Sequence, residues 1–132
     1  DSGEVPVLRH IPGIMVVPCD KTFGFVFRMT PEEKAEAAAY FGKRFDRACQ
    51  EAVQGGYDIL ILDEILASCN YGMVPEDELV KFLENKPEQL EVVLTGRDPS
   101  KHLAGLADYV SEIQMKKHPY TEGIPAREGI EY

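Results

Sequence analysis

Residues 57–64 read YDILILDE, an apolar run that ends in two acids, Asp63 and Glu64. Each residue from 59 to 62 is Ile or Leu, so both faces of the predicted strand are apolar. Such a strand is typical of a parallel sheet that is covered on both faces. The stretch therefore predicts an inner strand of an α/β protein.

Three further apolar runs are predicted to be strands, at residues 13–19, 90–95 and 109–115. Patterns of amphipathic helices separate them, and this alternation indicates a parallel sheet with helices on both faces. A chain of 132 residues is long enough for one hydrophobic core. We therefore expect residues 1–132 to form a single α/β domain.

The clearest helix signal begins at Thr30, which is followed by Pro31 and, three residues after the cap, by Glu33. Thr as N-cap, Pro at the first helical position and Glu at the third form the pattern of a capping box. Apolar residues then repeat at three- and four-residue steps until Gly55. Further helices are predicted at residues 75–86 and 98–106.

Composition excludes some classes of function. The net charge of −9 argues against binding to nucleic acid or to anionic membranes, because both need an excess of Lys and Arg. Cys19, Cys49 and Cys69 are widely spaced and form no CxxC pair, which favours reduced thiols in a cytoplasmic protein. The chain opens with Asp1 rather than Met, so we expect it to begin inside a longer gene product.

Ligands of a parallel sheet bind beyond the carboxyl ends of its strands, where Asp63 and Glu64 lie. Four apolar residues followed by Asp-Glu are typical of a Walker B strand, whose acids hold Mg²⁺ at a nucleotide. The alternative is that the acids mark the point where the strand reaches solvent. The phosphate-binding pattern GxxxxGK[ST], which normally accompanies a Walker B strand, is absent from the 132 residues.

Three other predicted strand ends carry candidate binding residues. Phe23, Phe25 and Phe27 could form a platform for a flat ligand, or could instead plug the end of the sheet as core. Thr95 and Arg97 offer a hydroxyl and a cation to an anionic ligand. His118 lies in a basic cluster with Lys116 and Lys117, for which solvated surface is the alternative.

Together these segments resemble one family, the P-loop type of corrinoid adenosyltransferase. The resemblance covers nearly the whole chain, and the closing stretch is its most specific part. The matching stretches are GFVF at 24–27, LILDE at 60–64, YG at 71–72, VVLTGR at 92–97, ADYVSE at 107–112, KHPY at 117–120, GIPA at 123–126 and GIEY at 129–132.

The resemblance implies a P-loop NTPase (RecA-like) fold and an enzyme that transfers the 5′-deoxyadenosyl group of ATP to Co(I) of a corrinoid, releasing triphosphate. By the same resemblance, Asp63 and Glu64 would hold Mg²⁺, and Phe25 and Phe27 would pack near the lower face of the corrin. Thr95, Arg97 and His118 would line the nucleotide side. An electron-donating reductase would supply Co(I), and no protein nucleophile would be needed.

The family's pattern also includes an initial strand, a P-loop, a helix and a second strand that this sequence does not contain. We therefore expect a fold lacking its first strands, with exposed sheet edges that favour a homodimer or a larger oligomer. The fragment by itself is expected to be a weak catalyst or inactive. The rival interpretation is a degenerate homologue that binds corrinoid or nucleotide without transferring the adenosyl group.

Overall fold

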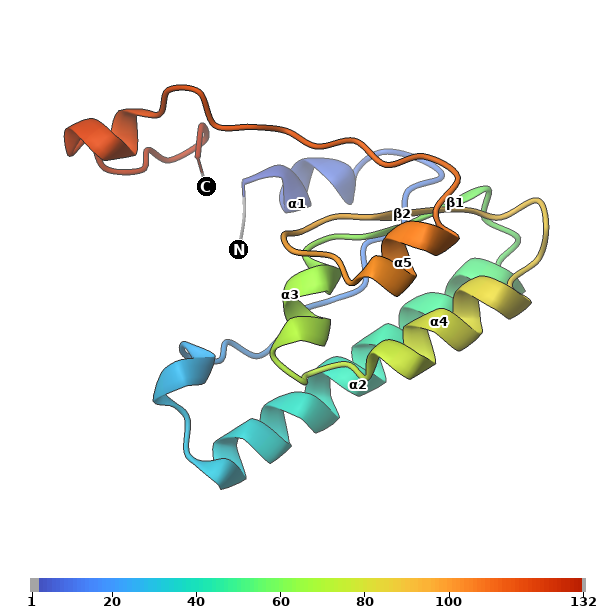
Figure 1. Cartoon of the computed structure of the whole chain (residues 1–132). Helices are drawn as coiled ribbons and strands as arrows, with labels where there is room; N and C mark the ends of the chain where they lie inside the picture. Colours follow the sequence, from blue (N-terminus) through green and yellow to red (C-terminus); the bar gives the residue numbers. More distant parts are fainter. Residues whose placement is uncertain (1–2, 132) are drawn as a thin grey trace. The chain divides into compact units, whose positions relative to one another are not determined.

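A computed structural model describes residues 3–131, which form two compact units. One unit is Cys19–Ala107, and the other comprises the described parts of 1–18 and 108–132. That the chain is one α/β domain stays a prediction. In chain order the elements, with η for a 3-10 helix, are α1 Glu4–Leu8, η1 Val26–Arg28, α2 Pro31–Gln54, β1 Ile59–Leu62, α3 Ile65–Asn70, α4 Glu76–Asn85, β2 Glu91–Leu94, α5 Lys101–Leu106 and η2 Pro119–Glu122 (Figure 1).

Helix α2 begins as its sequence predicts. The Thr30 hydroxyl accepts a hydrogen bond from the Glu33 amide at 3.2 Å, and the Glu33 carboxylate accepts one from the Thr30 amide at 2.7 Å. Pro31 occupies the first turn, and the helix ends at Gly55. This confirmed capping box satisfies two of the amide groups that a helix start leaves without partners.

The sheet consists of β1 and β2, which pair in parallel with Leu60 opposite Val92 and Leu62 opposite Leu94. Helices α3 and α4 form the connection between the two strands. A parallel pair requires such a crossover, because each strand must restart from the same end of the sheet. The chain is therefore an α/β protein, and both strands end at the same edge.

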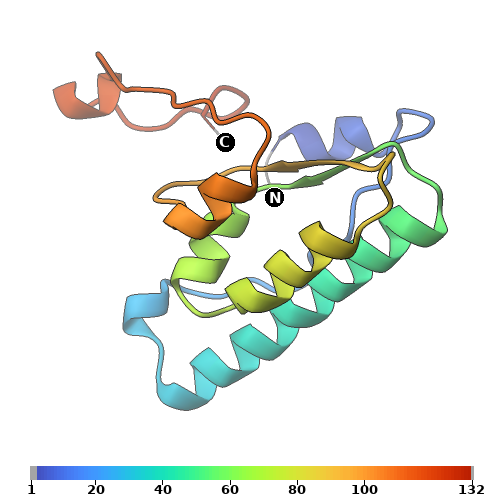
Figure 2. The same ribbon diagram turned by 45° about the vertical axis from the view of Figure 1, so that its right-hand side comes forward.

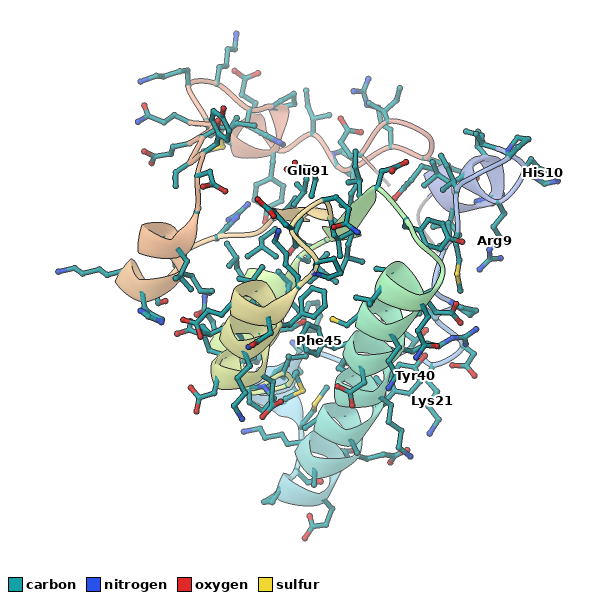
Figure 3. The ribbon with its side chains drawn as sticks, turned by 90° about the vertical axis from the view of Figure 1, so that its right-hand side faces the viewer. Arg9, His10, Lys21, Tyr40, Phe45 and Glu91 are labelled. Atoms are coloured by element: carbon teal, nitrogen blue, oxygen red, sulfur yellow. The ribbon has the colours of Figure 1, made fainter. Side chains whose placement is uncertain are left out.

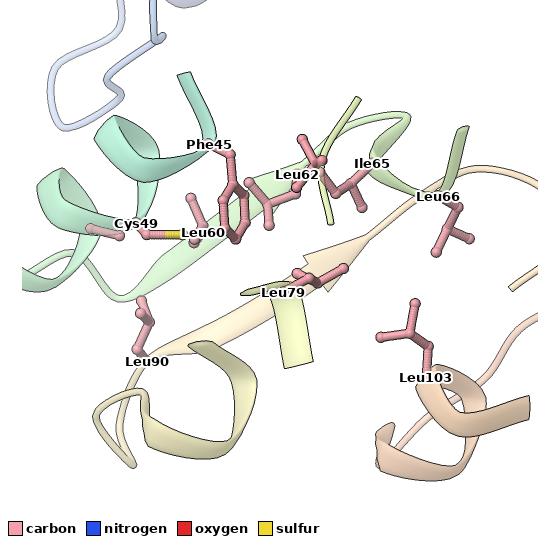
Figure 4. Close-up of a cluster of buried hydrophobic side chains, with 11 residues drawn as sticks. Phe45, Cys49, Leu60, Leu62, Ile65, Leu66, Leu79, Leu90 and Leu103 are labelled. Atoms are coloured by element: carbon pink, nitrogen blue, oxygen red, sulfur yellow. The ribbon is translucent and has the colours of Figure 1, made fainter. Parts of the chain in front are cut away.

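The core of this unit lies on one face of the sheet. Leu60 and Leu62 point into a buried cluster with Phe45, Leu79 and Leu103, which come from α2, α4 and α5 (Figure 4). The alternate residues of β1, Ile59 and Ile61, are 55% and 63% exposed. The expectation of helices on both faces is therefore wrong for the described residues. The apolar pattern was right, but only one face of this short sheet is covered.

Helices α2 and α4 meet along an aromatic contact. The rings of Phe45 and Phe82 pack edge to face with centroids 6.4 Å apart, and Phe45 lies between the two helices in Figure 3. Beside them a shallow groove of about 350 Å³ exposes part of this contact. The Cys49 thiol is buried under the groove. Burial, with a smaller contribution from Asp46, raises its pKa to about 12.

Two predicted strands are wrong. Residues 13–19 and 109–115 pair with no strand in the described part of the chain, and both carry exposed apolar side chains, including Ile14 at 43% and Ile113 at 98%. A strand exists only through hydrogen bonds to a neighbour, and neither segment has one among residues 3–131. An apolar run alone therefore does not make a strand.

The shorter helices depart from the sequence prediction at their starts. Helix α3 was not predicted, because it has only six residues and no side chain caps it. Helix α5 begins at Lys101 rather than at Asp98, since the Ser100 hydroxyl accepts a hydrogen bond from the Leu103 amide at 3.1 Å. The six-residue loop between β2 and α5, residues 95–100, thus lies at the edge where the strands end.

The second unit contains α1 and η2 and is otherwise irregular. Its firmest contact is the ion pair of Arg127 with Glu131, in which the guanidinium nitrogens Nη2 and Nε lie 2.8 and 3.2 Å from the two carboxylate oxygens. Across both units, no helix among residues 3–131 has the length and apolar character needed to cross a bilayer.

Candidate functional site

The parallel register brings Asp63 and Thr95 together directly after β1 and β2. The Thr95 hydroxyl donates a hydrogen bond to Asp63 Oδ1 at 2.6 Å and accepts one from the Glu64 amide at 2.8 Å. The Thr95 amide also continues the ladder by donating to the Leu62 carbonyl at 3.3 Å. One hydroxyl therefore fixes both acids relative to the neighbouring strand. We call Asp63, Glu64 and residues 95–97 the strand-end corner.

Unusual backbone conformations shape this corner. Glu64 has φ +56° and Asp98 has φ +53°, in the left-handed region that residues with side chains seldom adopt. Gly96 has φ +136°, and a Cβ there would lie 2.7 Å from the Leu66 Cβ. Only glycine fits that position, so α3 can begin close against the end of β2.

Asn70, at the end of α3, holds the loop that carries Arg97. Its side-chain Nδ2 donates to the carbonyl oxygens of Arg97 and Asp98, each at 3.2 Å. The guanidinium of Arg97 itself is exposed. Sequence reasoning missed Asn70, because the contact spans 27 residues and no local pattern signals it. The loop is therefore fastened from both α3 and β2.

The corner fits a hard divalent cation in its donor chemistry. Asp63 and Glu64 are exposed carboxylates, and Mg²⁺ is usually held by one or two carboxylates together with water and phosphate oxygens. Because Thr95 occupies Oδ1 of Asp63, Oδ2 remains for a metal. Among residues 3–131, no group of three or more His, Cys, Asp or Glu side chains forms a complete metal cage. A metal here would therefore need ligands from a substrate or from water.

The aromatic loop, residues 22–28, brings Phe25 and Phe27 together. Their rings are stacked, with centroids 5.3 Å apart and planes 21° apart, and their side chains are 66% and 75% exposed. Phe23 instead packs on Tyr40 and Phe41 of α2, with ring centroids 5.3 and 5.5 Å away. Phe23 is therefore half-buried against α2 rather than at the end of the sheet, whereas the other two rings face solvent as a platform would.

Tyr40 holds the foot of the aromatic loop, and no local sequence pattern signals this role. Its hydroxyl donates to Asp20 Oδ1 at 2.6 Å and accepts from the amides of Asp20 and Lys21 at 3.0 and 3.3 Å. The hydrogen bond between the Tyr40 hydroxyl and the Asp20 carboxylate lowers the pKa of that carboxyl and raises the pKa of the Tyr40 phenol. The segment before the platform is thus anchored to α2.

The remaining predicted residues are not gathered at one point by the structure. Within the described residues, no hydrogen bond or ring contact links the aromatic loop to the strand-end corner. Figures 1 and 2 nonetheless show η1 and α3 toward the same end of their unit. His118 lies in the other unit, where its Nδ1 accepts from the Tyr120 amide at 3.1 Å. Its role at a nucleotide stays a prediction.

Many α/β proteins carry acids and a threonine at adjacent strand ends. Comparison with known protein families identifies which of them this chain resembles. A sequence model of the family described as ATP:corrinoid adenosyltransferase BtuR/CobO/CobP matches residues 1–132. The chain therefore belongs to the ATP:corrinoid adenosyltransferase family.

Individual relatives agree with this membership. A corrinoid adenosyltransferase of Sinorhizobium sp. is 34% identical over 112 residues, 84% of this chain and 52% of that protein. The corrinoid adenosyltransferase of Escherichia coli K12 is 34% identical over 93 residues, 64% of this chain and 47% of that protein. The chain thus spans about half the length of these two curated relatives.

Proposed function

We propose that this chain contributes the metal-binding and corrin-binding parts of a site that transfers the 5′-deoxyadenosyl group from ATP to Co(I) of a corrinoid. The observation that supports this most directly is the Thr95–Asp63 hydrogen bond of 2.6 Å, which sets an exposed carboxylate at the end of a parallel strand. The family of the chain supplies the reaction class. The corner supplies residues suited to a metal-bound nucleotide.

In this proposal Asp63 and Glu64 hold Mg²⁺, which would neutralise charge on the triphosphate as it leaves. Thr95 acts through Asp63 and keeps that carboxylate in place, because its hydroxyl already occupies Oδ1. Arg97 offers a second positive group on a loop that Asn70 fastens. Preorganised charge of this kind stabilises a leaving group without further rearrangement of the protein.

Phe25 and Phe27 bind the corrin. Two stacked, exposed rings present apolar area to a flat ligand and lose little conformational freedom on binding. By packing against the lower face they exclude water and an axial ligand from cobalt, which makes reduction to Co(I) easier. The Co(I) substrate then attacks C5′ of ATP, so the protein provides position rather than a nucleophile.

Three parts of the proposal concern the wider assembly. A P-loop NTPase fold would hold the triphosphate, and GxxxxGK[ST] does not occur in these 132 residues, so the chain alone should transfer slowly. A reductase would deliver the electron in the cytoplasm. The exposed apolar side chains of Ile59, Ile61 and Val93 favour assembly into a dimer.

Titration of the chain with Mg·ATP tests the metal site. We expect Asp63→Asn and Glu64→Gln each to weaken binding of Mg·ATP by at least about tenfold while the melting temperature changes little. Glu88→Gln, which removes an exposed acid elsewhere in the same unit, is the matched control. Equal affinity in all four proteins would contradict the metal role.

An adenosylation assay, in which the colour change of the corrinoid is the readout, tests both the platform and the transfer reaction. Phe27→Ala should slow the reaction of a Co(II) corrinoid more than that of a pre-reduced Co(I) corrinoid. Equal slowing would contradict displacement of the axial ligand. Binding of both substrates by the unaltered chain with no transfer would instead favour the non-catalytic binder.

A further inference from the structure

Arg28 lies over the two exposed rings of the aromatic loop. Its guanidinium carbon is 5.7 Å from the centroid of the Phe25 ring and 5.5 Å from that of Phe27. Arg28 is the last residue of η1, so one turn of 3-10 helix carries the second ring and the cation together. The platform is therefore both aromatic and positively charged.

The guanidinium of Arg28 makes no hydrogen bond or ion pair within residues 3–131, where its described side-chain contacts are with the two rings. By contrast, two other cations are already paired, since Lys21 contacts Glu36 at 2.9 Å and Arg127 binds Glu131 through two nitrogens. A guanidinium has five N–H donors in a planar fork. Those of Arg28 are available to a ligand on the rings.

The ligand that fits this arrangement is flat and carries a carboxylate beside its apolar face. A corrin ring meets the first requirement, and its peripheral side chains end in either carboxylates or amides. A carboxylate accepts two parallel hydrogen bonds from a guanidinium, whereas an amide oxygen is neutral and binds more weakly. In a chain of net charge −9, an anionic ligand also needs a local cation.

We propose that Arg28 is a specificity-determining residue that binds a peripheral carboxylate of the corrinoid. The site then prefers corrinoids with free carboxylates over those in which every side chain is an amide. This inference rests on the proposed function, because Phe25 and Phe27 must first bind the corrin. An exposed cation–ring contact is weak and gives way to the stronger charge-assisted pair.

The test compares two probes on the full chain, cobyrinic acid with free carboxylates and cobinamide with amides, titrated by the absorbance of the corrin. Arg28→Gln should weaken binding of cobyrinic acid by roughly tenfold and leave cobinamide nearly unchanged. Arg28→Lys should lie between, because it keeps the charge without the planar fork. Arg47→Gln, an exposed position on α2, controls for the lost charge.

Three outcomes would overturn the inference, and they differ in what else they mean. Equal weakening for both probes would make Arg28 a part of the platform without selectivity. Weaker binding of ATP in Arg28→Gln, with corrinoid affinities unchanged, would assign the guanidinium to the triphosphate. Failure of the unaltered chain to bind either probe would remove the corrin platform and the proposed function with it.

Discussion

The strand-end corner and the aromatic loop are built in opposite ways. The corner is fixed by backbone and short side-chain hydrogen bonds, among them the 2.6 Å bond from Thr95 to Asp63, and by left-handed conformations. The platform rings of the loop contact each other and Arg28, and both are mostly exposed. At the corner, the Thr95 hydrogen bonds that hold Asp63 for a metal also stabilise the fold, whereas at the loop ligand binding can change without loss of the fold.

Among variants that test this difference, Gly96→Ala is expected to change the free energy of unfolding most. A methyl group at φ +136°, placed 2.7 Å from the Leu66 Cβ, should lower the free energy of unfolding by about 2–4 kcal/mol. Urea denaturation measures it. Gly42→Ala in α2 is the control, since a Cβ there meets nothing within 4 Å, and it should stabilise by about 0.5–1 kcal/mol. Similar results for the two variants would show that the corner is not strained.

A smaller loss is expected from Thr95→Val, which keeps the shape of the side chain and removes the hydroxyl. Two hydrogen bonds disappear, and the free energy of unfolding should fall by about 1–2 kcal/mol. Thr95→Ser retains the hydroxyl and should retain most of the stability. If the Ser variant is destabilised and the Val variant is not, the methyl group rather than the hydrogen bonds would matter at this position.

The smallest effect on stability is expected from Tyr40→Phe at the foot of the aromatic loop, and it should show as a change in titration. The Tyr40 hydrogen bond is the main reason that the pKa of Asp20 lies below its ordinary 3.8. The variant should therefore raise this pKa, measured from the carboxyl ¹³C shift, though not fully, because the backbone amide and nearby cations still act. Tyr57→Phe is the control and should leave the titration of Asp20 unchanged.

The sign of the pH dependence follows from these directions. The depressed pKa of Asp20 means that its contribution is present above pH 3.8 and is lost as pH falls through the folded value. The raised pKa of Tyr40 means that its contribution is present below pH 10.0 and is lost as pH rises through the folded value. The foot of the loop should therefore loosen at both extremes.

Local signals predicted the elements that local chemistry decides. The capping box of Thr30 and Glu33, the apolar strand before Asp63 and the helix after Pro75 were all legible in short stretches. Residues 13–19 and 109–115 were misjudged, since strand formation needs a partner that a run of apolar residues cannot reveal. Neither segment has such a partner strand among residues 3–131.

The candidate site divides in the same way. Asp63, Glu64 and Thr95 were expected from their place at strand ends, and the register joins Asp63 to Thr95. Asn70 and Tyr40 were missed, because each acts across about 20 or more residues through a contact that only the folded chain creates. The acids at the strand end and the threonine beside them are visible in sequence, whereas Asn70 and Tyr40, which fasten the two loops, are not.

The buried thiol of Cys49, between α2 and α4, offers a way to measure how well these two helices protect the interior. At pH 8 Cys49, with a pKa of about 12, is almost wholly protonated, and its side chain is 8% exposed at the bottom of the groove, so it should react slowly with a thiol reagent. Cys19 is exposed and should react fast, and Cys69 is half-buried and should lie between the two. The ratio of the Cys49 rate to the Cys19 rate measures how strongly the packing of α2 on α4 protects the thiol.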